Sequence, residues 1–415
     1  MPTKTTRGLK MKKVMVLGIG AQGSIIARRL MEEEGIVEVV CADYDQKAAE
    51  EIVKFSNKGK AVRLDATIFD DIVKAAKGCE LIVNALPPEF NMAVMDACLE
   101  AKAHYQDLAS GPARDMGFIP AIERQLGRSA EFEQAGLAAL TNTGSAPGMA
   151  NVITREACEL FESVETIKIC VYDGIWSNKF TPFWWSPETA FGDMAAEGVI
   201  YEDKQFKTVP PFNNPEMMEF KYLGPRLMFD HEHEEPVTMG LLSDKYLKGV
   251  ENVYFRFGGP GCELARHFWK MGLLSEEAID IKGQKVVPMD VVRKLTPPAP
   301  KYKNEIKAVL EEGMASEENA FLVRVDGIRN GKKARVDAYF MGPGLTDSFK
   351  LAGISHETYG TGQCAFLFSK MFVNGIISTR GVFPPEALNA EERQYYFRES
   401  EKLKLTVEFN MEYLV

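Results

Sequence analysis

The fold is decided by the stretch Lys13-Val-Met-Val-Leu-Gly18-Ile-Gly20-Ala-Gln-Gly23 near the start of the chain. Its apolar residues predict a buried strand, and the residues that follow, 24–34, predict a helix. Gly18 permits a tight turn between them, Gly20 lets the backbone approach a pyrophosphate, and Gly23 lets the helix pack closely on the strand. The stretch therefore predicts a dinucleotide-binding turn.

The start of that helix and the end of the next strand complete the expected cofactor site. Backbone N–H groups at Ala21 and Gln22 meet the phosphates, and the positive end of the helix dipole favours them. Asp43 closes the second apolar run, 37–42, where its carboxylate is placed to accept hydrogen bonds from the ribose. A 2′-phosphate would meet this negative charge, so we expect NAD rather than NADP. The alternative for Asp43 is a solvated residue that only closes the strand.

Further cofactor contacts are expected where the third and fourth strands end. Asp65 ends the third strand, and Pro87-Pro88 breaks the fourth, which is expected at 80–85. Ligands of open α/β sheets lie beyond the carboxyl ends of the strands. The contacts expected beyond the fourth strand are Asn84, Ala85, Leu86 and Pro87, the last two on the nicotinamide side.

Strands and helices alternate through the first 145 residues. The other strands of this part are expected at 61–64, 104–108 and 137–141, and the other helices at 46–58, 67–77, 91–103 and 119–133. Apolar strands that alternate with amphipathic helices form parallel crossovers. This half therefore predicts an α/β fold with a doubly wound parallel sheet of the Rossmann type.

The pattern changes beyond residue 150. Residues 165–172 alternate like a sheet strand, and Asn330-Gly331 is a turn signal between two more expected strands, 321–327 and 333–340. These features predict a second α/β domain with a mixed or antiparallel sheet.

A helix near the carboxyl end sets the expected domain boundaries. It is predicted at 365–374, with Gly375 as its C-cap and a tight glycine loop, 359–362, before it. We expect this helix to return to the nucleotide domain. The domains are then a dinucleotide-binding domain at 1–149 and about 355–395, and a substrate domain at about 150–354 that the tail 396–415 joins.

The bulk composition excludes several classes of function. The 415 residues carry a formal net charge of −10, whereas nucleic-acid binding needs a basic surface. No stretch is long and apolar enough to span a membrane, and residues 1–12 fit a disordered lead-in rather than a secretion signal. The 7 cysteines lie scattered in apolar stretches without a CxxC pair, which indicates buried, reduced thiols. We therefore expect a cytoplasmic protein.

No metal site is predicted. His231 and His233 lie beside Glu232, Glu234 and Glu235, which superficially suggests a metal centre. In a strand this spacing puts both histidines on one face, but no third ligand is evident, so a solvated acidic loop is the favoured interpretation.

Four further segments carry a family resemblance. They are Asn84-Ala-Leu-Pro-Pro, His104-Tyr-Gln-Asp-Leu-Ala, Gly144-Ser-Ala-Pro-Gly-Met, and Gly360-Thr-Gly-Gln-Cys through Gly381-Val-Phe-Pro-Pro-Glu-Ala. Together they resemble the saccharopine dehydrogenase family, in its saccharopine reductase and lysine 6-dehydrogenase branch. The resemblance implies reversible hydride transfer between a nicotinamide and an amine-bearing carbon of an amino acid, through an imine. It also implies a Rossmann domain and a substrate domain that carries the contact of a homodimer.

The resemblance extends to two short segments in the middle of the chain. Phe183-Trp-Trp-Ser-Pro is similar to the family's Trp-Ser motif on a substrate-side loop, which makes Trp185 a candidate substrate contact. Tyr222-Leu-Gly-Pro-Arg226 is similar to a segment whose arginine holds a substrate carboxylate, and a bidentate clamp suits the guanidinium of Arg226. The alternative for Arg226 is a surface ion pair with the acidic stretch 230–235.

Two aspartates are candidates for proton transfer. Asp107 ends a strand beside the expected cofactor and is placed to hold or deprotonate an ammonium, with a turn cap for Ser110-Gly111 as its alternative. Asp173 ends a strand of the substrate domain and is the second candidate. A lid against water, or alternatively a cluster in the core, is expected from Trp176, Trp184 and Trp185.

These observations predict an NAD(P)-dependent oxidoreductase that acts on the CH–NH or CH–NH2 group of a lysine- or saccharopine-like amino acid. Ala146 stands where the reductases usually carry an aspartate, so the lysine 6-dehydrogenase form fits better. Two alternatives stay open. One is reductive condensation of an amine with a carbonyl compound, of the opine or carboxynorspermidine type. The other is a non-catalytic NAD-binding protein.

Overall fold

The computed structural model describes residues 12–111 and 116–414 of the chain, which form two compact units. Unit 1 contains the residues up to Val152 together with Thr361–Ser400, and unit 2 contains Ile153–Gly360 together with the residues from Glu401 onward. The chain passes between the units inside three helices, α7 (Met149–Cys158), α15 (His356–Val373) and, at its last residue, α16 (Ala390–Glu401). The expected lead-in at 1–12 lies, except for Lys12, outside the described residues.

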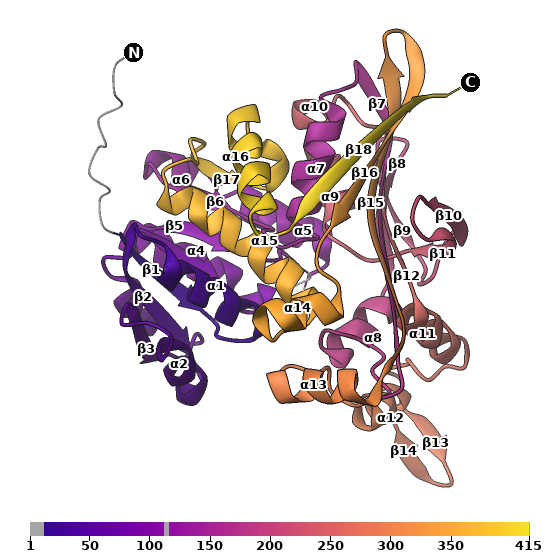
Figure 1. Ribbon diagram of the computed structural model, residues 1–415, viewed down its shortest axis with the longest axis horizontal. Helices are drawn as coiled ribbons and strands as arrows, with labels where there is room; N and C mark the ends of the chain where they lie inside the picture. Colours follow the sequence, from indigo (N-terminus) through magenta and orange to yellow (C-terminus); the bar gives the residue numbers. More distant parts are fainter. Residues whose placement is uncertain (1–11, 112–115, 415) are drawn as a thin grey trace. The chain divides into compact units, whose positions relative to one another are not determined.

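Unit 1 is built on a parallel sheet of seven strands in the order β17-β6-β5-β4-β1-β2-β3, as far as the chain is described. Figure 1 shows this sheet, in which β17 comes from the carboxyl-terminal part of the chain. The strands are β1 (Lys12–Leu17), β2 (Ile36–Asp43), β3 (Gly59–Arg63), β4 (Leu81–Asn84), β5 (His104–Asp107), β6 (Ala138–Leu140) and β17 (Gly381–Phe383). The predicted α/β fold with a doubly wound sheet is confirmed.

The order of the strands places the expected cofactor site. Successive strands run from β1 to β3 in one direction and from β4 to β6 in the other, so the order reverses between β1 and β4. In the register of these two neighbours Leu17 pairs with Asn84, which aligns their carboxyl ends. Ligands of open α/β sheets bind at such a switch point. Residues 14–17 of β1 and all of β4 are buried, as their apolar sequences predict.

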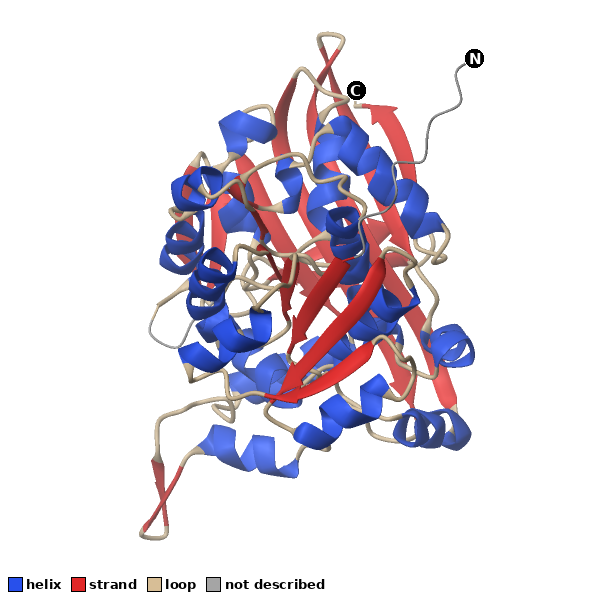
Figure 2. Cartoon of the chain, turned by 90° about the vertical axis from the view of Figure 1, so that its left-hand side faces the viewer, coloured by secondary structure: helices blue, strands red, loops and turns tan. Residues whose placement is uncertain are grey.

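Helices connect the strands of unit 1 and lie against its sheet (Figure 2). They are α1 (Ala21–Glu32), α2 (Gln46–Val53), α3 (Phe69–Ala76), η1 (Pro88–Phe90), α4 (Asn91–Ala101), α5 (Phe118–Leu126), α6 (Ser129–Gln134), η2 (Pro385–Ala387) and α16 (Ala390–Glu401). The single helix expected at 119–133 is wrong. Its two pieces, α5 and α6, are separated at Gly127-Arg128, and the hydroxyl of Ser129 accepts a hydrogen bond from the backbone of Val382 on β17.

Unit 2 contains a mixed sheet in the order β10-β11-β12-β7-β15-β16-β18, and β8 joins it by pairing with both β12 and β9. Among these pairs β7 and β12 are parallel and the others are antiparallel. The strands are β7 (Ser163–Ser177), β8 (Gly198–Glu202), β9 (Gln205–Val209), β10 (Glu216–Phe220), β11 (Gly224–Asp230), β12 (Asn252–Gly258), β15 (Met314–Arg329), β16 (Lys332–Met341) and β18 (Thr406–Tyr413). The predicted second, mixed sheet is confirmed.

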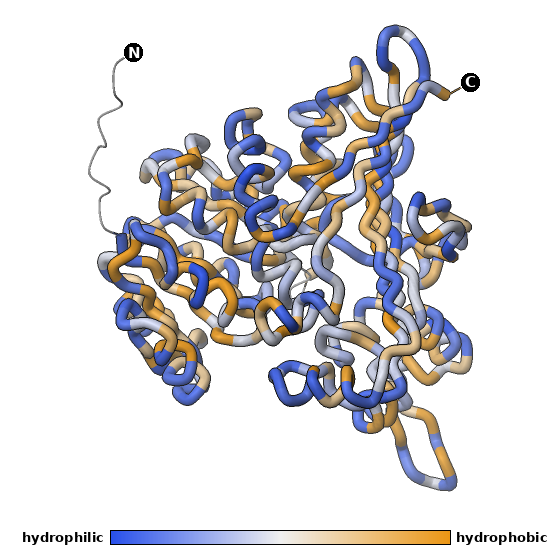
Figure 3. Tube along the Cα trace, viewed as in Figure 1, coloured by the Kyte–Doolittle hydropathy of each residue, from blue (hydrophilic) through white to orange (hydrophobic). Residues whose placement is uncertain are grey.

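The hairpin of β15 and β16 turns at the predicted residues. Asn330 and Gly331 both have positive φ angles, 50° and 68°, as a two-residue hairpin turn requires. Figure 3 shows that the turn is hydrophilic, in contrast to the apolar stretches of the strands below it. The alternation of apolar and polar residues in the two strands and the Asn-Gly turn were together sufficient to predict this hairpin.

The helices of unit 2 are short and connect its strands. They are α8 (Pro187–Ala195), α9 (Glu235–Leu241), α10 (Ser243–Tyr246), α11 (Pro260–Lys270), α12 (Pro288–Leu295), α13 (Lys303–Glu312) and α14 (Leu345–Ala352). A separate two-stranded sheet is formed by β13 (Ile279–Ile281) and β14 (Gln284–Val286). None of the helices in the described part of the chain is long and apolar enough to cross a membrane. All 7 cysteines are buried and none forms a disulfide.

Helix α15 begins much earlier than predicted, so the glycine loop expected at 359–362 is wrong. Ser355 accepts a hydrogen bond from the backbone of Thr358 and thereby supports the first turn. Gly362 lies inside the helix, where an added Cβ would come within 3.0 Å of Ile25 on α1. Close helix packing therefore explains this glycine. Gly375 follows the helix with φ +64°, in agreement with its predicted role as a cap.

Candidate functional site

The glycine turn of unit 1 has the shape of a dinucleotide cradle. Gly18 has φ +92°, and a Cβ there would lie 2.8 Å from the carbonyl oxygen of Ala85. A Cβ on Gly23 would lie 1.8 Å from the carbonyl oxygen of Gly18. Around Gly20, in contrast, a Cβ would meet nothing within 4 Å. The first and third glycines are thus required by the packing of the protein itself, and the second leaves open space in front of the helix.

The start of α1 suits an anion in that space. Gly20 is its N-cap, no side chain of the described residues caps it, and its first turn carries no acidic residue. Helix N-termini present backbone N–H groups and positive dipole ends, which favour phosphate. The residues at this turn, including Ala21 and Gln22, therefore fit the pyrophosphate of a dinucleotide.

Asp43 braces the glycine turn from the end of β2. Its Oδ2 accepts a hydrogen bond of 2.5 Å from the backbone N–H of Ile19, and its Oδ1 accepts one of 2.7 Å from the N–H of Asp45. Asp43 is therefore more than a solvated residue that closes the strand, because it holds the backbone of the glycine turn. A carboxylate has about four lone-pair sites, so acceptor capacity is left for a ribose hydroxyl.

An arginine that the sequence did not indicate lies beside Asp43. Arg63 is its register partner on β3, and the Arg63 guanidinium lies 5.5 Å from the centre of the Tyr44 ring. Lys47 and Arg28 are nearer to Asp43 or to the turn in sequence, but Arg28 instead stacks on Phe55 at 4.6 Å. The pairing of β2 with β3 places Arg63 at this edge, which the sequence alone does not show.

Asp65 forms an exposed turn beyond β3. Its Oδ1 accepts hydrogen bonds from the hydroxyl of Thr67 at 2.7 Å and from its backbone N–H at 3.0 Å. These bonds lower the pKa of Asp65 below its usual value. The structure thus shows a turn-forming role, and a cofactor contact of Asp65 stays a prediction.

The residues expected beyond β4 gather beside the glycine turn. The backbone N–H of Ala85 donates to the carbonyl of Leu17, and a Cβ on Gly18 would lie 2.9 Å from the Leu86 side chain. Asn84 is buried, donates to Asn91 at 2.8 Å, and accepts from the backbone of Leu86 at 3.3 Å. Asn84 therefore shapes the turn that Pro87 continues.

Asp107 is buried in unit 1 with both carboxylate oxygens engaged. They accept hydrogen bonds from the Tyr105 hydroxyl at 2.9 Å, the Gln125 amide at 2.8 Å and the Asn142 backbone at 2.7 Å. Burial raises the pKa of Asp107 to about 6. The arrangement ties β5 to the loop after β6, and it differs from the cap of Ser110-Gly111 considered as the alternative.

Asn142 was missed by the sequence reasoning. Its φ is +61°, its side chain is 0% exposed, and neither atom of its amide hydrogen-bonds with a described residue. A buried amide without partners is costly and marks a place where a ligand can bind. The polar run Thr141-Asn-Thr directly after β6 is the sequence signal by which it could have been found.

Asp173 of unit 2 has a partner that the sequence did not reveal. Its Oδ1 lies 3.7 Å from Nε2 of His356, at the start of α15, and the two side chains are 17% and 14% exposed. Neither Asp173 Oδ1 nor His356 Nδ1 forms a hydrogen bond with a described residue. The pair is therefore largely shielded from solvent. A small movement of either side chain would bring the two atoms within hydrogen-bond distance for proton transfer, and both Asp173 Oδ1 and His356 Nδ1 can still hydrogen-bond to a bound molecule.

The tryptophans of unit 2 do not form the expected three-residue lid. Trp176 is exposed, whereas Trp184 is buried and presents its edge to His356, with ring centres 5.5 Å apart. Trp185 packs against Phe257 at 5.7 Å. The core alternative holds for Trp184, and the two adjacent tryptophans face different groups.

Arg226 is paired, but not with the stretch considered in the sequence. Its Nη2 lies 2.7 Å from Oε2 of Glu318, and its guanidinium lies 5.5 Å from the centre of the Tyr172 ring. The pair raises the pKa of Arg226 further. Its positive charge is thus already neutralised within unit 2.

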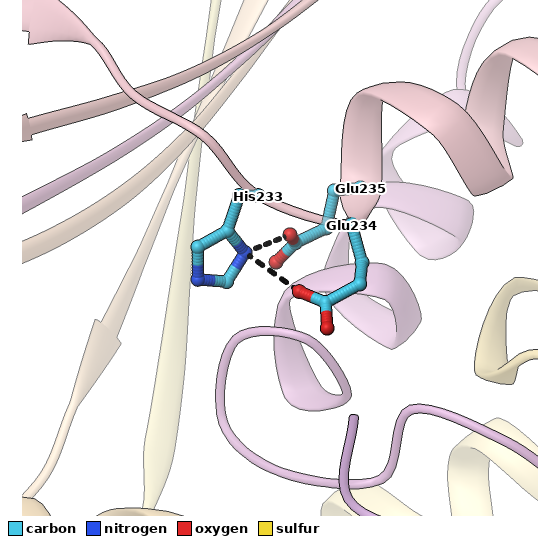
Figure 4. Close-up of side chains that lie close together, drawn as sticks. All are labelled: His233, Glu234 and Glu235. Carbon is cyan, nitrogen blue, oxygen red and sulfur yellow. Dashed lines mark hydrogen bonds and ion pairs between the residues drawn. The ribbon is translucent and has the colours of Figure 1, made fainter. Parts of the chain in front are cut away.

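The acidic stretch 230–235 is not a solvated loop, so that interpretation is wrong. Glu234 and Glu235 are buried at the start of α9. Figure 4 shows the ring of His233 facing both carboxylates, with Nδ1 bonded to Glu235 and 3.6 Å from Oε2 of Glu234. Burial alone lowers the pKa of His233, but the facing carboxylates outweigh it and raise the pKa to about 9. Within the described part of the chain these three residues also lie close enough to hold a metal ion.

Two family models together cover most of the chain. Residues 14–141 match the saccharopine dehydrogenase NADP binding domain, and residues 144–402 match the saccharopine dehydrogenase C-terminal domain.

Two characterised relatives match along nearly their whole length. Carboxyaminopropylagmatine dehydrogenase of a Synechocystis species is 24% identical over 92% of this chain and 94% of its own. Carboxynorspermidine synthase of Vibrio alginolyticus is 25% identical over 91% of this chain and 92% of its own.

Two solved structures share the fold. Apo saccharopine dehydrogenase (L-Glu forming) from Saccharomyces cerevisiae has a TM-score of 0.69 at 15% identity, covering 97% of this chain and 100% of its own. Homospermidine synthase from Legionella pneumophila, in complex with NAD, has a TM-score of 0.67 at 12% identity, covering 97% and 91%.

Proposed function

This chain belongs to the saccharopine dehydrogenase family, and from that premise we propose that it joins an amine to a carbonyl compound by NAD(P)H-dependent reductive condensation. The product is a secondary amine. This is the alternative that the sequence left open beside the oxidation of a lysine- or saccharopine-like amino acid.

The charge of unit 2 carries the proposal. Arg226 is paired with Glu318, and the buried Arg256 is paired with Glu216 at 2.7 Å and with Asp230 at 3.2 Å. Near His233, in contrast, unit 2 carries the part-buried carboxylates of Asp193 and Glu232. Carboxylates suit a cationic amine, whereas a substrate rich in carboxylates needs free guanidinium groups.

The relatives support the same choice. The names carboxynorspermidine synthase and carboxyaminopropylagmatine dehydrogenase refer to carboxylated polyamine derivatives, and the Legionella enzyme is named for homospermidine. Ala146 argues against saccharopine as the substrate, since the reductases usually carry an aspartate there, and it is therefore consistent with a different amine substrate.

The reaction needs two proton movements that Asp173 and His356 are suited to make. The substrate ammonium must lose a proton before its nitrogen attacks the carbonyl carbon, and the carbonyl oxygen must gain protons to leave as water. We assign both transfers to the Asp173–His356 pair, since one partner holds a proton while the other accepts one. Loss of water leaves a protonated C=N bond. When bound, the nicotinamide cofactor supplies the hydride whose two electrons reduce this bond to CH–NH.

The glycine turn and the residues beyond β4 would hold that cofactor in unit 1. Gly18, Gly20 and Gly23 shape the phosphate site, and Leu86 and Pro87 stay the proposed contacts on the nicotinamide side. Asp43 remains the reason to expect NAD, with Arg63 as the group that would admit NADP. We further propose a homodimer in the cytoplasm. Light scattering of the purified protein tests the dimer and should give twice the chain mass of 46.3 kDa.

The decisive experiment compares the two directions of chemistry. The protein is incubated with NADH or NADPH, with a diamine or agmatine, and with an aldehyde that carries an amino-acid group. We expect the reduced cofactor to be consumed only when both amine and aldehyde are present, with the secondary amine identified by mass spectrometry. Reduction of NAD by lysine alone would favour the amino-acid dehydrogenase instead. Tight cofactor binding without turnover of any amine or aldehyde would favour the non-catalytic alternative.

A further inference from the structure

We propose that the side-chain amide of Asn142 binds the carboxamide group of the nicotinamide ring, and that it thereby positions the ring of the cofactor. This inference rests on the nicotinamide cofactor of the proposed function and adds a residue to its binding site. Asn142 follows β6 closely and belongs to unit 1, as the glycine turn does. It lies far from that turn in the chain, so the glycine motif gives no hint of it.

The amide of Asn142 has no partner in the described protein. Its side chain is 0% exposed, and neither Oδ1 nor Nδ2 forms a hydrogen bond with a described residue. A polar group buried in this way costs free energy until a partner supplies the missing donor and the missing acceptor. The amide therefore calls for a bound group that both donates and accepts.

The backbone around Asn142 is, in contrast, held firmly. Its own N–H donates to Oδ1 of Asp107 at 2.7 Å, and the N–H of Thr143 donates to the Asp107 carbonyl at 3.0 Å. The N–H of Thr141 donates to the carbonyl of Phe383 on β17 at 3.1 Å. A backbone shift that gave the amide a partner within the protein would break these bonds. The side chain is thus presented from a fixed loop.

The backbone conformation of Asn142 is one that few side chains tolerate. Its φ angle is +61°, in the left-handed region. Asparagine adopts this region more readily than most residues, and glycine adopts it without strain. Glycine can therefore replace Asn142 without disturbing the path of the loop.

The position of Asn142 matches the half of the sheet that serves the nicotinamide. Each half of a doubly wound sheet binds one nucleotide, and the glycine turn and Asp43 mark the adenosine half. Asn142 lies beyond the carboxyl end of β5, since its N–H is bonded to Asp107 there. Two strand spacings, about 10 Å, separate β5 from β1. A nicotinamide riboside that extends from the pyrophosphate over β4 is long enough to cover this span.

A carboxamide is the chemical complement of this side chain. It carries one C=O and one NH2 group, as asparagine does. The two can pair by parallel hydrogen bonds, in which Nδ2 donates to the carboxamide oxygen and Oδ1 accepts from its nitrogen. A phosphate would satisfy only Nδ2, and an ammonium would satisfy only Oδ1. The hydroxyls of the nicotinamide ribose also donate and accept, so a ligand with this ribose but without the ring must be compared.

The contact requires a small opening of the side chains around Asn142, because its amide is covered in the absence of the cofactor. The cost of this opening is offset by the free energy gained when the two unpaired atoms obtain partners. We therefore expect the ring to bind against a loop whose backbone is already in place.

Calorimetric titration tests the contact without amine or aldehyde. Three ligands are compared: NAD, ADP-ribose, which has both riboses and both phosphates but no nicotinamide, and nicotinic acid adenine dinucleotide, which has a carboxylate in place of the carboxamide. In Asn142→Gly the dissociation constant for NAD should rise by about ten-fold or more, as loss of two hydrogen bonds implies. That for ADP-ribose should stay unchanged. Wild type should prefer NAD to nicotinic acid adenine dinucleotide, and the variant should lose most of this preference.

The matched control is Asn214→Gly, because Asn214 is an exposed residue of unit 2 with a φ angle of +49°. It makes the same substitution in the same backbone conformation and should change none of the three dissociation constants. Thermal unfolding checks that both variants fold. A lower melting temperature of Asn142→Gly with unchanged binding of NAD would show that the residue only supports the loop, and would overturn the proposal.

The remaining outcomes separate this assignment from the proposed function. Equal losses of affinity for NAD and ADP-ribose in Asn142→Gly would move the contact to the ribose or the phosphates and overturn the pairing with the carboxamide. Reductive condensation would still stand, since the cofactor binds. Failure of condensation in the turnover assay would leave the three titrations to decide on Asn142. A wild-type protein that binds neither NAD nor NADP would overturn both proposals.

Discussion

Nε2 of His356 lies 3.7 Å from Oδ1 of Asp173, and neither this Oδ1 nor Nδ1 of the histidine forms a hydrogen bond with the described chain. The aspartate comes from the central strand β7 and the histidine from the first turn of α15. Both residues lie in unit 2, so their contact is formed entirely within the substrate domain. An imidazole beside a carboxylate is a common arrangement for proton transfer near neutral pH.

Replacement of His356 should damage catalysis without damaging cofactor binding. We expect His356→Gln and Asp173→Asn to lower kcat by about 10² to 10⁴-fold, the usual contribution of general acid–base catalysis. The pH profile of kcat should change in each variant, because a side chain that transfers a proton has been replaced. The affinity for NAD(P)H, measured by fluorescence titration, should stay unchanged.

The control for this prediction is His267→Gln, which changes an exposed histidine on α11 of the same unit. It should leave both kcat and its pH profile as in wild type. A His356→Gln variant with an intact pH profile and a reduced melting temperature would show that the histidine only supports the fold.

The second prediction separates the roles of two glycines. Gly20→Ala should fold normally, because a Cβ there meets nothing in the protein, but it should weaken cofactor binding by at least about ten-fold, because the methyl group occupies the path of the pyrophosphate. Gly23→Ala should lower the melting temperature as well, since its Cβ would overlap the carbonyl of Gly18. Thermal unfolding and fluorescence titration measure the two effects. Equal melting temperatures with equal losses of binding would contradict this division.

The nucleotide half was predictable because its signals are local. Strands buried on both faces, such as β1 and β4, appear as continuous apolar runs, and the glycine turn has a fixed order of residues. The hairpin at Asn330-Gly331 followed from the same kind of local chemistry. The break between α5 and α6 did not, because it depends on a contact of Ser129 with the distant strand β17.

The substrate half was predicted less well because its site depends on long-range contacts. His356 becomes a candidate only through its contact with Asp173, which is far away in the chain. Arg63 becomes a candidate only through the register of β2 and β3. Glu234 and Glu235 were expected in solvent, since carboxylates are rarely buried. Their burial became evident only in the structure, where His233 faces both carboxylates.

The third prediction concerns the choice of cofactor. Asp43→Ala should weaken NAD binding more than NADP binding, because we propose that the carboxylate contacts the ribose of NAD and would repel the 2′-phosphate of NADP. Arg63→Ala should selectively weaken NADP, and Lys60→Ala, an exposed residue on the same strand, should change neither. Dissociation constants for both cofactors check this. An unchanged NAD:NADP ratio in Asp43→Ala would move the ribose contact to another residue.

The last prediction uses the pH dependence of stability to test Asp107. Its pKa in the folded protein is about 6, above the ordinary value of 3.8, because burial disfavours the charge. A raised pKa means that the neutral form stabilises the fold fully below about pH 4, and that this contribution is lost as the pH rises through 6. In Asp107→Asn the side chain cannot ionise, so the free energy of unfolding of wild type should fall relative to this variant by up to about 3 kcal/mol between pH 4 and 7.

Urea unfolding of both proteins at several pH values measures this difference, with Glu100→Gln on the exposed side of α4 as the control that should show none. We also expect Asp107→Asn to keep kcat within about ten-fold of wild type, because its carboxylate is occupied by Tyr105, Gln125 and Asn142. A large loss of kcat with a flat stability difference would instead return Asp107 to the role of proton carrier. That result would place the reacting amine against unit 1 and remove the need for the Asp173–His356 pair in the chemical step.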